Sequence, residues 1–167
     1  MLTADEVGFN EFVAARGPAL QRAAYLLCGD HHHAQDLVQS ALLQAARHWG
    51  RIHTSPEAYV RRSIFTANVS RWRRKRFDEH ELVGDHAHAT RADADNDLRM
   101  TLVDALDQLT TRQRAVLVLR YYEDLTETAT AETLAISVNT VKSTHRRALA
   151  RLREVAPELS ELIGRTS

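Results

Sequence analysis

Residues 138–153 carry side chains suited to chemistry with a nucleic acid. The segment holds five basic residues and no acid. Its polar positions recur at helical spacing on one face, and they are Asn139, Thr140, Lys142, Ser143, Arg146 and Arg147. Arginine can donate two hydrogen bonds to a guanine edge, whereas lysine and serine mainly bind phosphates. The pattern favours a helix that reads DNA, and the alternative is an ordinary αα-hairpin with a solvated basic face.

A second basic set lies in residues 61–76, which hold seven basic residues and no acid. Basic groups can follow a phosphate backbone, and an aromatic ring or an amide among them can hold an unstacked base. The segment therefore favours contact with single-stranded nucleic acid, against the alternative of a solvated basic helix end. The candidate residues are Asn68, Arg71, Trp72, Arg73, Arg74 and Arg76.

The sequence gives little support for a metal site or a catalytic site. The densest group of ligand-type residues is Cys28 with His31–His33, but structural zinc needs four converging ligands, usually as paired spacings on two elements. The single cysteine excludes an intramolecular disulfide. The motifs of nucleotide hydrolysis and acyl transfer are missing from the sequence. We expect no metal site, no cofactor and no enzyme, with a His-rich metal-dependent protein as the third alternative.

A helix-turn-helix would position the first basic set. Thr126 is expected to cap a short helix whose inward residues are Ala131 and Leu134. Residues 135–137 form the expected turn, with Ile136 as its apolar plug. The longer second helix then turns an apolar stripe inward, made by Val138, Val141, Ala148, Leu149 and Leu152.

The segment before residue 77 predicts four helices. Gly17-Pro18 is expected to divide residues 9–28 into two helices, because proline is favoured at a first helical position. A third helix is expected over residues 34–49 and a fourth from Pro56, which Ser55 would cap.

A second group of four helices is expected from Leu98 onwards, the last being the basic helix. Thr110 and Gln113 predict a capping box at the start of residues 111–123, and Pro157 is expected in a turn before a short tail. The predicted class is all-α, with two small helical domains over residues 1–76 and 98–167. An acidic flexible linker over residues 77–97 would join them.

The chain of 167 residues has a formal net charge of zero, which is an average over blocks of opposite sign. Residues 78–97 hold seven acids against one arginine, and they lie between the two basic segments. This acidic block could mask the basic faces, or it could be an inert solvated linker. The sequence shows neither a membrane-length apolar run nor a signal peptide, so a cytoplasmic protein without a membrane partner is expected.

Three segments in this order resemble the group IV (extracytoplasmic function) sigma factors of bacterial RNA polymerase, and in particular an actinobacterial sigma-E-like family. AQDLVQSALLQAARHW resembles the core-binding helix of that family. AYVRRSIFTANVSRWRRKR is similar to the helix that melts and reads the −10 promoter element, and LTETATAETLAISVNTVKSTHRRALARLR to the −35-reading helix-turn-helix.

The resemblance implies a sigma factor that directs promoter-specific transcription initiation. Its partners would be core RNA polymerase, through the β′ clamp and the β flap, and promoter DNA, and an anti-sigma factor stays open. Core binding would fall to Asp36 and Gln39, within a motif that includes Leu37 and Val38. Asn68 would capture a flipped −10 base, residues 71–76 would hold the single strand, and the 138–153 helix would enter the −35 major groove.

The sequence departs from the family pattern at three places. Ser40 replaces the usual acid after Gln39, which predicts a weaker contact with core polymerase. Thr130 and Thr133 replace aliphatic residues, and Ala135 replaces a turn glycine, so a less tightly packed second domain is expected. The main functional alternative is a stand-alone helix-turn-helix regulator that never joins polymerase and needs a dimer on palindromic sites.

Overall fold

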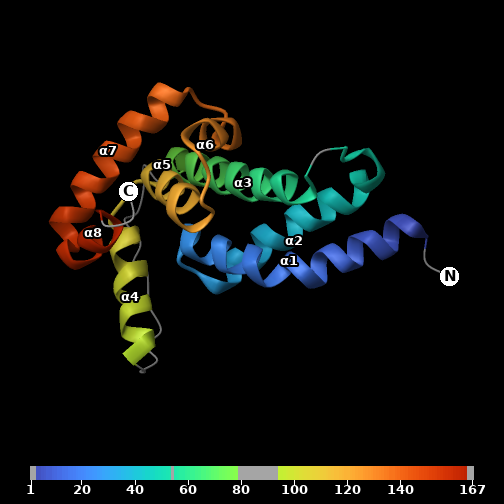
Figure 1. The fold of residues 1–167 in the computed structure, drawn as a ribbon, viewed down its shortest axis with the longest axis horizontal. Helices are drawn as coiled ribbons and strands as arrows, with labels where there is room; N and C mark the ends of the chain where they lie inside the picture. The colour runs from blue at the N-terminus through green and yellow to red at the C-terminus, as the bar shows by residue number, and fades with distance from the viewer. Residues whose placement is uncertain (1–2, 54, 79–93, 165–167) are drawn as a thin grey trace.

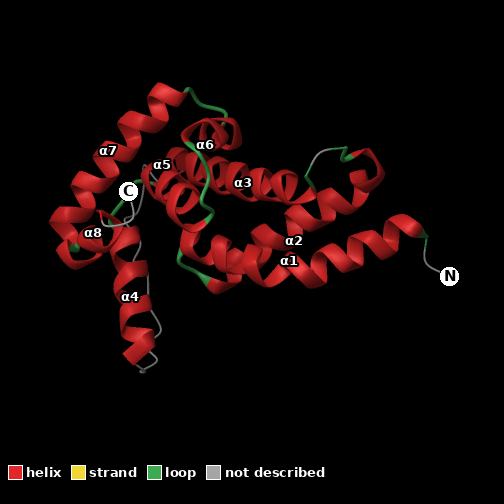
Figure 2. Cartoon of the chain, viewed as in Figure 1, coloured by secondary structure: helices red, strands yellow, loops and turns green. Residues whose placement is uncertain are grey.

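The computed structural model describes residues 3–53, 55–78 and 94–164, and within these ranges every regular element is a helix (Figure 2). The expected all-α class is therefore confirmed. In the described helices, the side chains of residues 72–73, 75–78, 94–100, 160 and 162–164 lie outside the description. None of the described helices is both long and apolar enough to cross a membrane.

The first helix, α1 (Ala4–Cys28), starts at a capping box between Thr3 and Glu6 and ends at Gly29, whose φ of 73° is left-handed. It continues through Pro18, so the prediction of two helices divided at Gly17-Pro18 is wrong. A proline removes one backbone hydrogen bond from a helix interior. Here residues on both sides of Pro18, from Phe12 to Leu27, pack against the same hydrophobic core, which holds the two halves in one helix.

The second and third helices are α2 (His31–His48) and α3 (Pro56–Asp78), separated by a short 3₁₀ turn over Trp49–Arg51. Asp30 caps α2 by accepting a 2.7 Å hydrogen bond from the His33 amide. The histidine run therefore forms the first turn of α2, three residues before the expected start. Ser55 accepts from the Ala58 amide at 3.2 Å, as expected for the cap of α3.

The second half begins with α4 (Ala94–Asp107) and α5 (Thr111–Leu117), followed by a π-helical turn, η2 (Val118–Tyr122). Thr110 and Gln113 form the expected capping box. The helix expected over residues 111–123 is thus α-helical only in its first part. Of the predicted linker 77–97, both ends are helical in α3 and α4, and residues 79–93 lie outside the described residues.

The helix-turn-helix consists of α6 (Glu127–Leu134) and α7 (Val138–Val155), and α8 (Pro157–Gly164) follows it. Thr126 caps α6 as expected, and Ser137 caps α7. Ala135 takes the left-handed conformation with φ 53°, which costs a residue with a Cβ about 1–2 kcal/mol relative to glycine. Pro157 starts a further helix, so the basic helix is not the last one.

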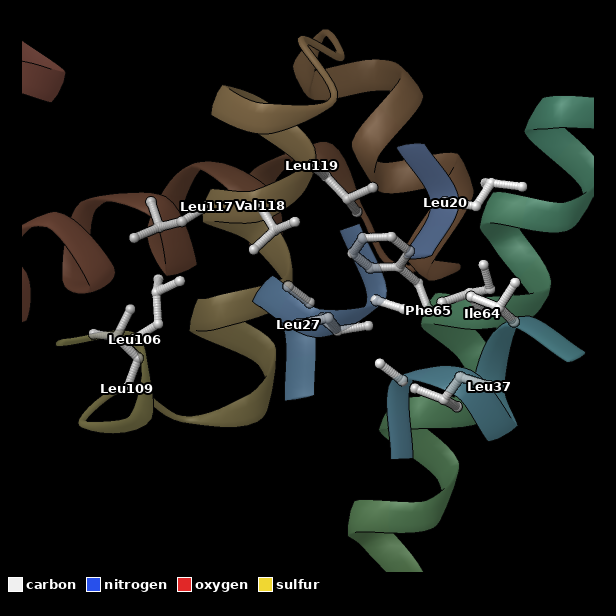
Figure 3. Packing of buried hydrophobic residues seen from close by; sticks show 14 of the residues in the cluster. Leu20, Leu27, Leu37, Ile64, Phe65, Leu106, Leu109, Leu117, Val118 and Leu119 are labelled. Atoms are coloured by element: carbon white, nitrogen blue, oxygen red, sulfur yellow. The ribbon is translucent and has the colours of Figure 1, made fainter. Parts of the chain in front are cut away.

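One hydrophobic core connects the first region, α1–α3, with the second region, α4–α8. In Figure 1, α5 and α6 lie against α3, while α4, α7 and α8 gather at one end of the molecule. Figure 3 shows the Phe65 ring of α3 beside Leu119 of η2, and Leu27 of α1 belongs to the same core cluster. The sequence predicted two domains joined by a linker and did not predict contact between them, whereas helices of the two regions share one core.

Candidate nucleic-acid interface

Helix α7 turns its basic residues toward solvent because its apolar residues are used inside. Val141, Ala148 and Leu152 are fully buried, and Thr144 is buried beside them. The opposite face is open: Asn139, Lys142, Arg146 and Arg147 are exposed, and Thr140 and Ser143 are half-buried. All six residues predicted to bind the −35 element therefore share one accessible side of the helix.

Local hydrogen bonds fix the small hydroxyls at the start of this face. The Ser137 and Thr140 hydroxyls lie 2.8 Å apart, and the Ser143 hydroxyl donates to the Thr140 carbonyl at 3.1 Å. The Lys142 ammonium is 3.8 Å from the Glu127 carboxylate of α6, at an exposed site where such a pair contributes little. Arg146 and Arg147 are both exposed and are therefore the better candidates for direct contact with a ligand.

The inner flank of α7 is pinned to the π-helical turn by an aromatic pair. The rings of Tyr121 and His145 stack with centroids 5.6 Å apart, and the Tyr121 hydroxyl lies 2.9 Å from His145 Nε2. Partial burial, and then the nearby Arg120, lower the pKa of His145 below its usual value. The neutral ring can accept a hydrogen bond from Tyr121, so η2 helps to set the orientation of α7.

The candidate residues of α3 differ in side-chain exposure more than those of α7 do. Arg71 and Arg74 are exposed, whereas Asn68 is only 6% exposed. Trp72, Arg73 and Arg76 lie on the helix, but their side chains are outside the description. The residue expected to capture a base, Asn68, is therefore buried.

A cavity of about 430 Å³ lies between the two regions beside Asn68. The first region lines it with Asp30, Asp36 and Arg71, and the second with Asp107 and Arg114. The cavity thus brings the expected core-binding residue, Asp36, and two expected −10 residues close to α4 and α5. Sequence spacing alone did not indicate this juxtaposition.

The expected core-binding residues of α2 divide by burial. Asp36 and Gln39 are exposed, whereas Leu37 and Val38 are buried at 6% and 5% exposure. Leu37 and Val38 therefore hold α2 in the core and do not present a surface to a partner. Leu43 lies on the exposed face of Asp36 and is 61% exposed, a position that the sequence analysis left unassigned and that helical spacing would have found.

The histidine cluster has other contacts in the structure. The His31 ring stacks on Tyr25 with centroids 4.1 Å apart, and the Cys28 thiol lies 3.3 Å from the Asp30 carbonyl. Burial raises the pKa of the Cys28 thiol. Across the residues that the structure describes, no three His, Cys, Asp or Glu side chains are grouped so that they could hold a metal ion.

Both regions match parts of one protein family. Residues 12–77 match Sigma-70 region 2, and residues 105–154 match Sigma-70 region 4. The RNA polymerase sigma-E factor of Streptomyces coelicolor is 39% identical over 154 residues, covering 87% of this chain and 84% of that protein. The protein of the same name from Streptomyces avermitilis is 40% identical over 152 residues, covering 87% and 83%.

Solved structures share the fold at lower sequence identity. The sigma factor RpoE of Bartonella quintana, in complex with the anti-sigma factor NepR, has a TM-score of 0.74 and 22% identity, with 90% of this chain and 98% of that chain covered. CnrH, in complex with the cytosolic domain of CnrY, has a TM-score of 0.61 and 24% identity, with 88% and 86% covered. These likenesses support the fold.

Proposed function

The chain belongs to the sigma-70 family of RNA polymerase sigma factors, as the resemblance predicted, and on this premise we propose how its surfaces divide the work. The first region binds core RNA polymerase and reads the −10 element, and the second region reads the −35 element. The protein acts as a binding subunit and not as an enzyme, in the cytoplasm, where the polymerase works. Promoter-specific transcription initiation is the result.

The observation that carries this proposal is the presence of two basic helices on two matched regions. Helix α7 offers Arg146 and Arg147 on an open face beside the half-buried hydroxyls of Thr140 and Ser143. Guanidinium groups can read guanine in a major groove, while the smaller groups fix phosphates. Helix α3 adds the exposed Arg71 and Arg74 for the melted strand.

Core polymerase would dock on the exposed face of α2. Asp36 and Gln39 supply polar contacts there, and the buried Leu37 and Val38 keep the helix in place. The β flap would bind the second region. An anti-sigma factor stays a prediction for this chain.

Run-off transcription with core polymerase tests the proposal. Promoters selected by the protein in complex with core should support transcription, and Arg146→Ala should reduce it about fivefold or more, because a good base contact contributes about 1–3 kcal/mol. Arg151→Ala is the matched control, since Arg151 is exposed on the same helix and pairs with Glu154 at 3.0 Å. A protein that fails to bind core would contradict the proposal.

The stand-alone regulator is not favoured, because the match includes Sigma-70 region 2 as well as region 4. A protein of that kind would bind palindromic DNA as a dimer without polymerase. Analytical ultracentrifugation of the free chain with DNA distinguishes the two functions.

A further inference from the structure

The cavity between the two regions has the size and the lining of a small-molecule site. Its volume of about 430 Å³ is within the range of about 300–1,000 Å³ that is usual for small-molecule pockets. Leu27 and Leu109, both labelled in Figure 3, are its two leucines. The other lining residues are mostly polar or charged. The cavity is therefore suited to a ligand that has both apolar and polar parts.

The Arg114 guanidinium is buried in the wall of this cavity, and its hydrogen bonds are incomplete. Its Nε donates to the Leu26 carbonyl at 2.6 Å, and one Nη donates to the Asp107 carboxylate. The other nitrogen, Nη2, is buried and has no hydrogen-bond acceptor among the described residues. A buried charged donor without an acceptor costs free energy, so this nitrogen favours a further acceptor.

The turn after α1 lies next to Nη2 of Arg114. A Cβ added to Gly29 would be 3.2 Å from this nitrogen. Cys28 and Asp30, the neighbours of Gly29 in the chain, both line the cavity. Nη2 therefore lies at the part of the cavity wall that this turn forms.

A second guanidinium lies at the same cavity. Arg71 of α3 lines it and is exposed. Burial raises the pKa of the Cys28 thiol, and the charges of Arg114 and Arg71 both oppose this rise, so both guanidinium groups lie near this thiol. Two guanidinium groups at one cavity are suited to a phosphate, because its anionic oxygens accept several charge-assisted hydrogen bonds.

The acidic residues of the cavity indicate the rest of the ligand. Asp107 pairs with Arg114, and Asp30 accepts from the His33 amide at 2.7 Å, so both carboxylates are already engaged. Asp36 of α2 is exposed and also lines the cavity. A carboxylate accepts hydrogen bonds and repels a phosphate. A ligand would thus present its phosphate to the arginines and a hydroxyl or N–H group to Asp36.

We propose that this cavity is a binding site for a nucleoside monophosphate. Arg71 and Arg114 bind the phosphate, and Asp36 accepts a hydrogen bond from a sugar hydroxyl or from the base. Leu27 and Leu109 contact the flat ring of the base. The lining residues come from both regions, so the bound nucleotide stabilises the contact between the regions. This site is additional to the proposed function and does not require polymerase.

Isothermal titration calorimetry of the full chain without polymerase tests the site. The probes are the four ribonucleoside 5′-monophosphates, and at least one of them should bind with one-to-one stoichiometry. The matching nucleoside, ribose 5-phosphate and inorganic phosphate should each bind at least about tenfold more weakly, because each lacks a part of the contacts. Thermal unfolding should shift to higher temperature in the presence of the nucleotide that binds.

Arg71→Met should weaken nucleotide binding about tenfold or more, since it removes a charge-assisted contact with the phosphate. Arg74→Met is the matched control, because Arg74 is another exposed arginine of α3 and is not among the lining residues. It should change the affinity by less than about twofold. Arg114→Met should also weaken binding, against Arg112→Met as its control. If Arg114→Met does not fold, the two α3 variants decide the result by themselves.

A DNA strand is the other source of a phosphate for Arg71, which was also assigned to the −10 strand. A short single-stranded DNA oligonucleotide at the same phosphate concentration should not displace the nucleotide, since a chain of linked nucleotides does not fit into the cavity. Displacement would overturn the proposal and assign the cavity to the DNA surface.

Three further results would overturn the proposal. They are no binding of any of the four nucleotides, equal weakening by Arg71→Met and Arg74→Met, and equally tight binding of the nucleoside, ribose 5-phosphate or inorganic phosphate. Each measurement is made without polymerase, so its result does not depend on whether the chain directs transcription. Run-off transcription tests the proposed function separately.

Discussion

Helices α3 and α7 carry similar chemistry and differ in what lies over it. On α7 the apolar residues point into the protein core, and Arg146 and Arg147 stay exposed on the opposite side. On α3 the stripe that contains Asn68 also contains Phe65, and the second region packs on it. Because Arg71 and Arg74 of α3 remain exposed while Asn68 is buried, the comparison teaches that a polar residue is accessible only where it lies off the apolar stripe of its helix.

The two regions also differ in how their cores are built. In α1–α3 the buried residues are mainly aliphatic, alanine or phenylalanine, with Asn68 as a buried polar residue. The second region buries Arg114, Thr130 and Thr144, and it includes a π-helical turn and the left-handed Ala135. The looser packing expected of the helix-turn-helix stays a prediction, which the unsatisfied Thr130 hydroxyl and the left-handed Ala135 motivate.

The largest effect is expected where the second region covers α3. Leu119→Ala should lower the free energy of unfolding by about 2–5 kcal/mol, because it leaves a cavity beside Phe65 in the shared core. Leu43→Ala is the control and should change it by less than about 0.5 kcal/mol, since Leu43 is 61% exposed. Urea unfolding measures both, and similar values would mean that Leu119 lies outside a packed joint.

A smaller loss of folding stability is expected at the polar edge of the contact between the two regions. Arg114→Met should cost about 1–3 kcal/mol, because the Leu26 carbonyl loses its donor and Asp107 loses an ion-pair partner. Arg112→Met, at an exposed position of the same helix, should have little effect. Equal unfolding free energies for the two variants would show that the Arg114 contacts contribute nothing.

Thr130→Val should stabilise the second region by about 1 kcal/mol. Thr130 is fully buried and its hydroxyl has no hydrogen-bond partner, so valine would remove an unsatisfied polar group at similar volume. Thr133→Val is the contrasting variant. The Thr133 hydroxyl donates to the Ala129 carbonyl at 2.8 Å, so valine would remove a hydrogen bond and give no gain in stability. Thermal unfolding that shows no gain for Thr130→Val would argue for a water-satisfied hydroxyl.

The smallest effect concerns pH and His145. Its pKa is lowered in the folded chain, so the unfolded chain binds the proton more readily. The contribution to stability is complete above the unfolded pKa of about 6.5 and falls as the pH drops toward the folded pKa. His145→Gln should therefore lose less stability than the unmodified protein between about pH 7.5 and about pH 5.5. His53→Gln, at an exposed site, should behave as the unmodified protein does.

Local sequence signals predicted the helix starts that are set by capping residues. The caps at Thr110, Thr126 and Ser55 could be recognised because a hydroxyl bonds an amide only three residues away. Pro18 shows the limit of such signals. A proline weakens a helix locally, but packing on both sides of Pro18 keeps α1 continuous.

The exposed −35 face could be predicted because one helix determines it. Helical spacing alone separates Arg146 and Arg147 from Val141 and Leu152. Helical spacing in the same way separates the exposed Leu43 of α2 from the buried Leu37 and Val38. Spacing could not show that Tyr121 pins His145, because a π-helical turn shifts the side chains that follow it.

The sequence by itself determined the helices, the caps and the two basic segments, since each depends on residues within a few positions of one another. Only the tertiary structure decided that Arg61 meets Glu123 and that Asn68 is covered. Those contacts join positions 62 residues apart in the case of Arg61 and Glu123, and they depend on how one apolar face fits another. Helical periodicity says which residues face inward, and it carries no information on which region they will meet.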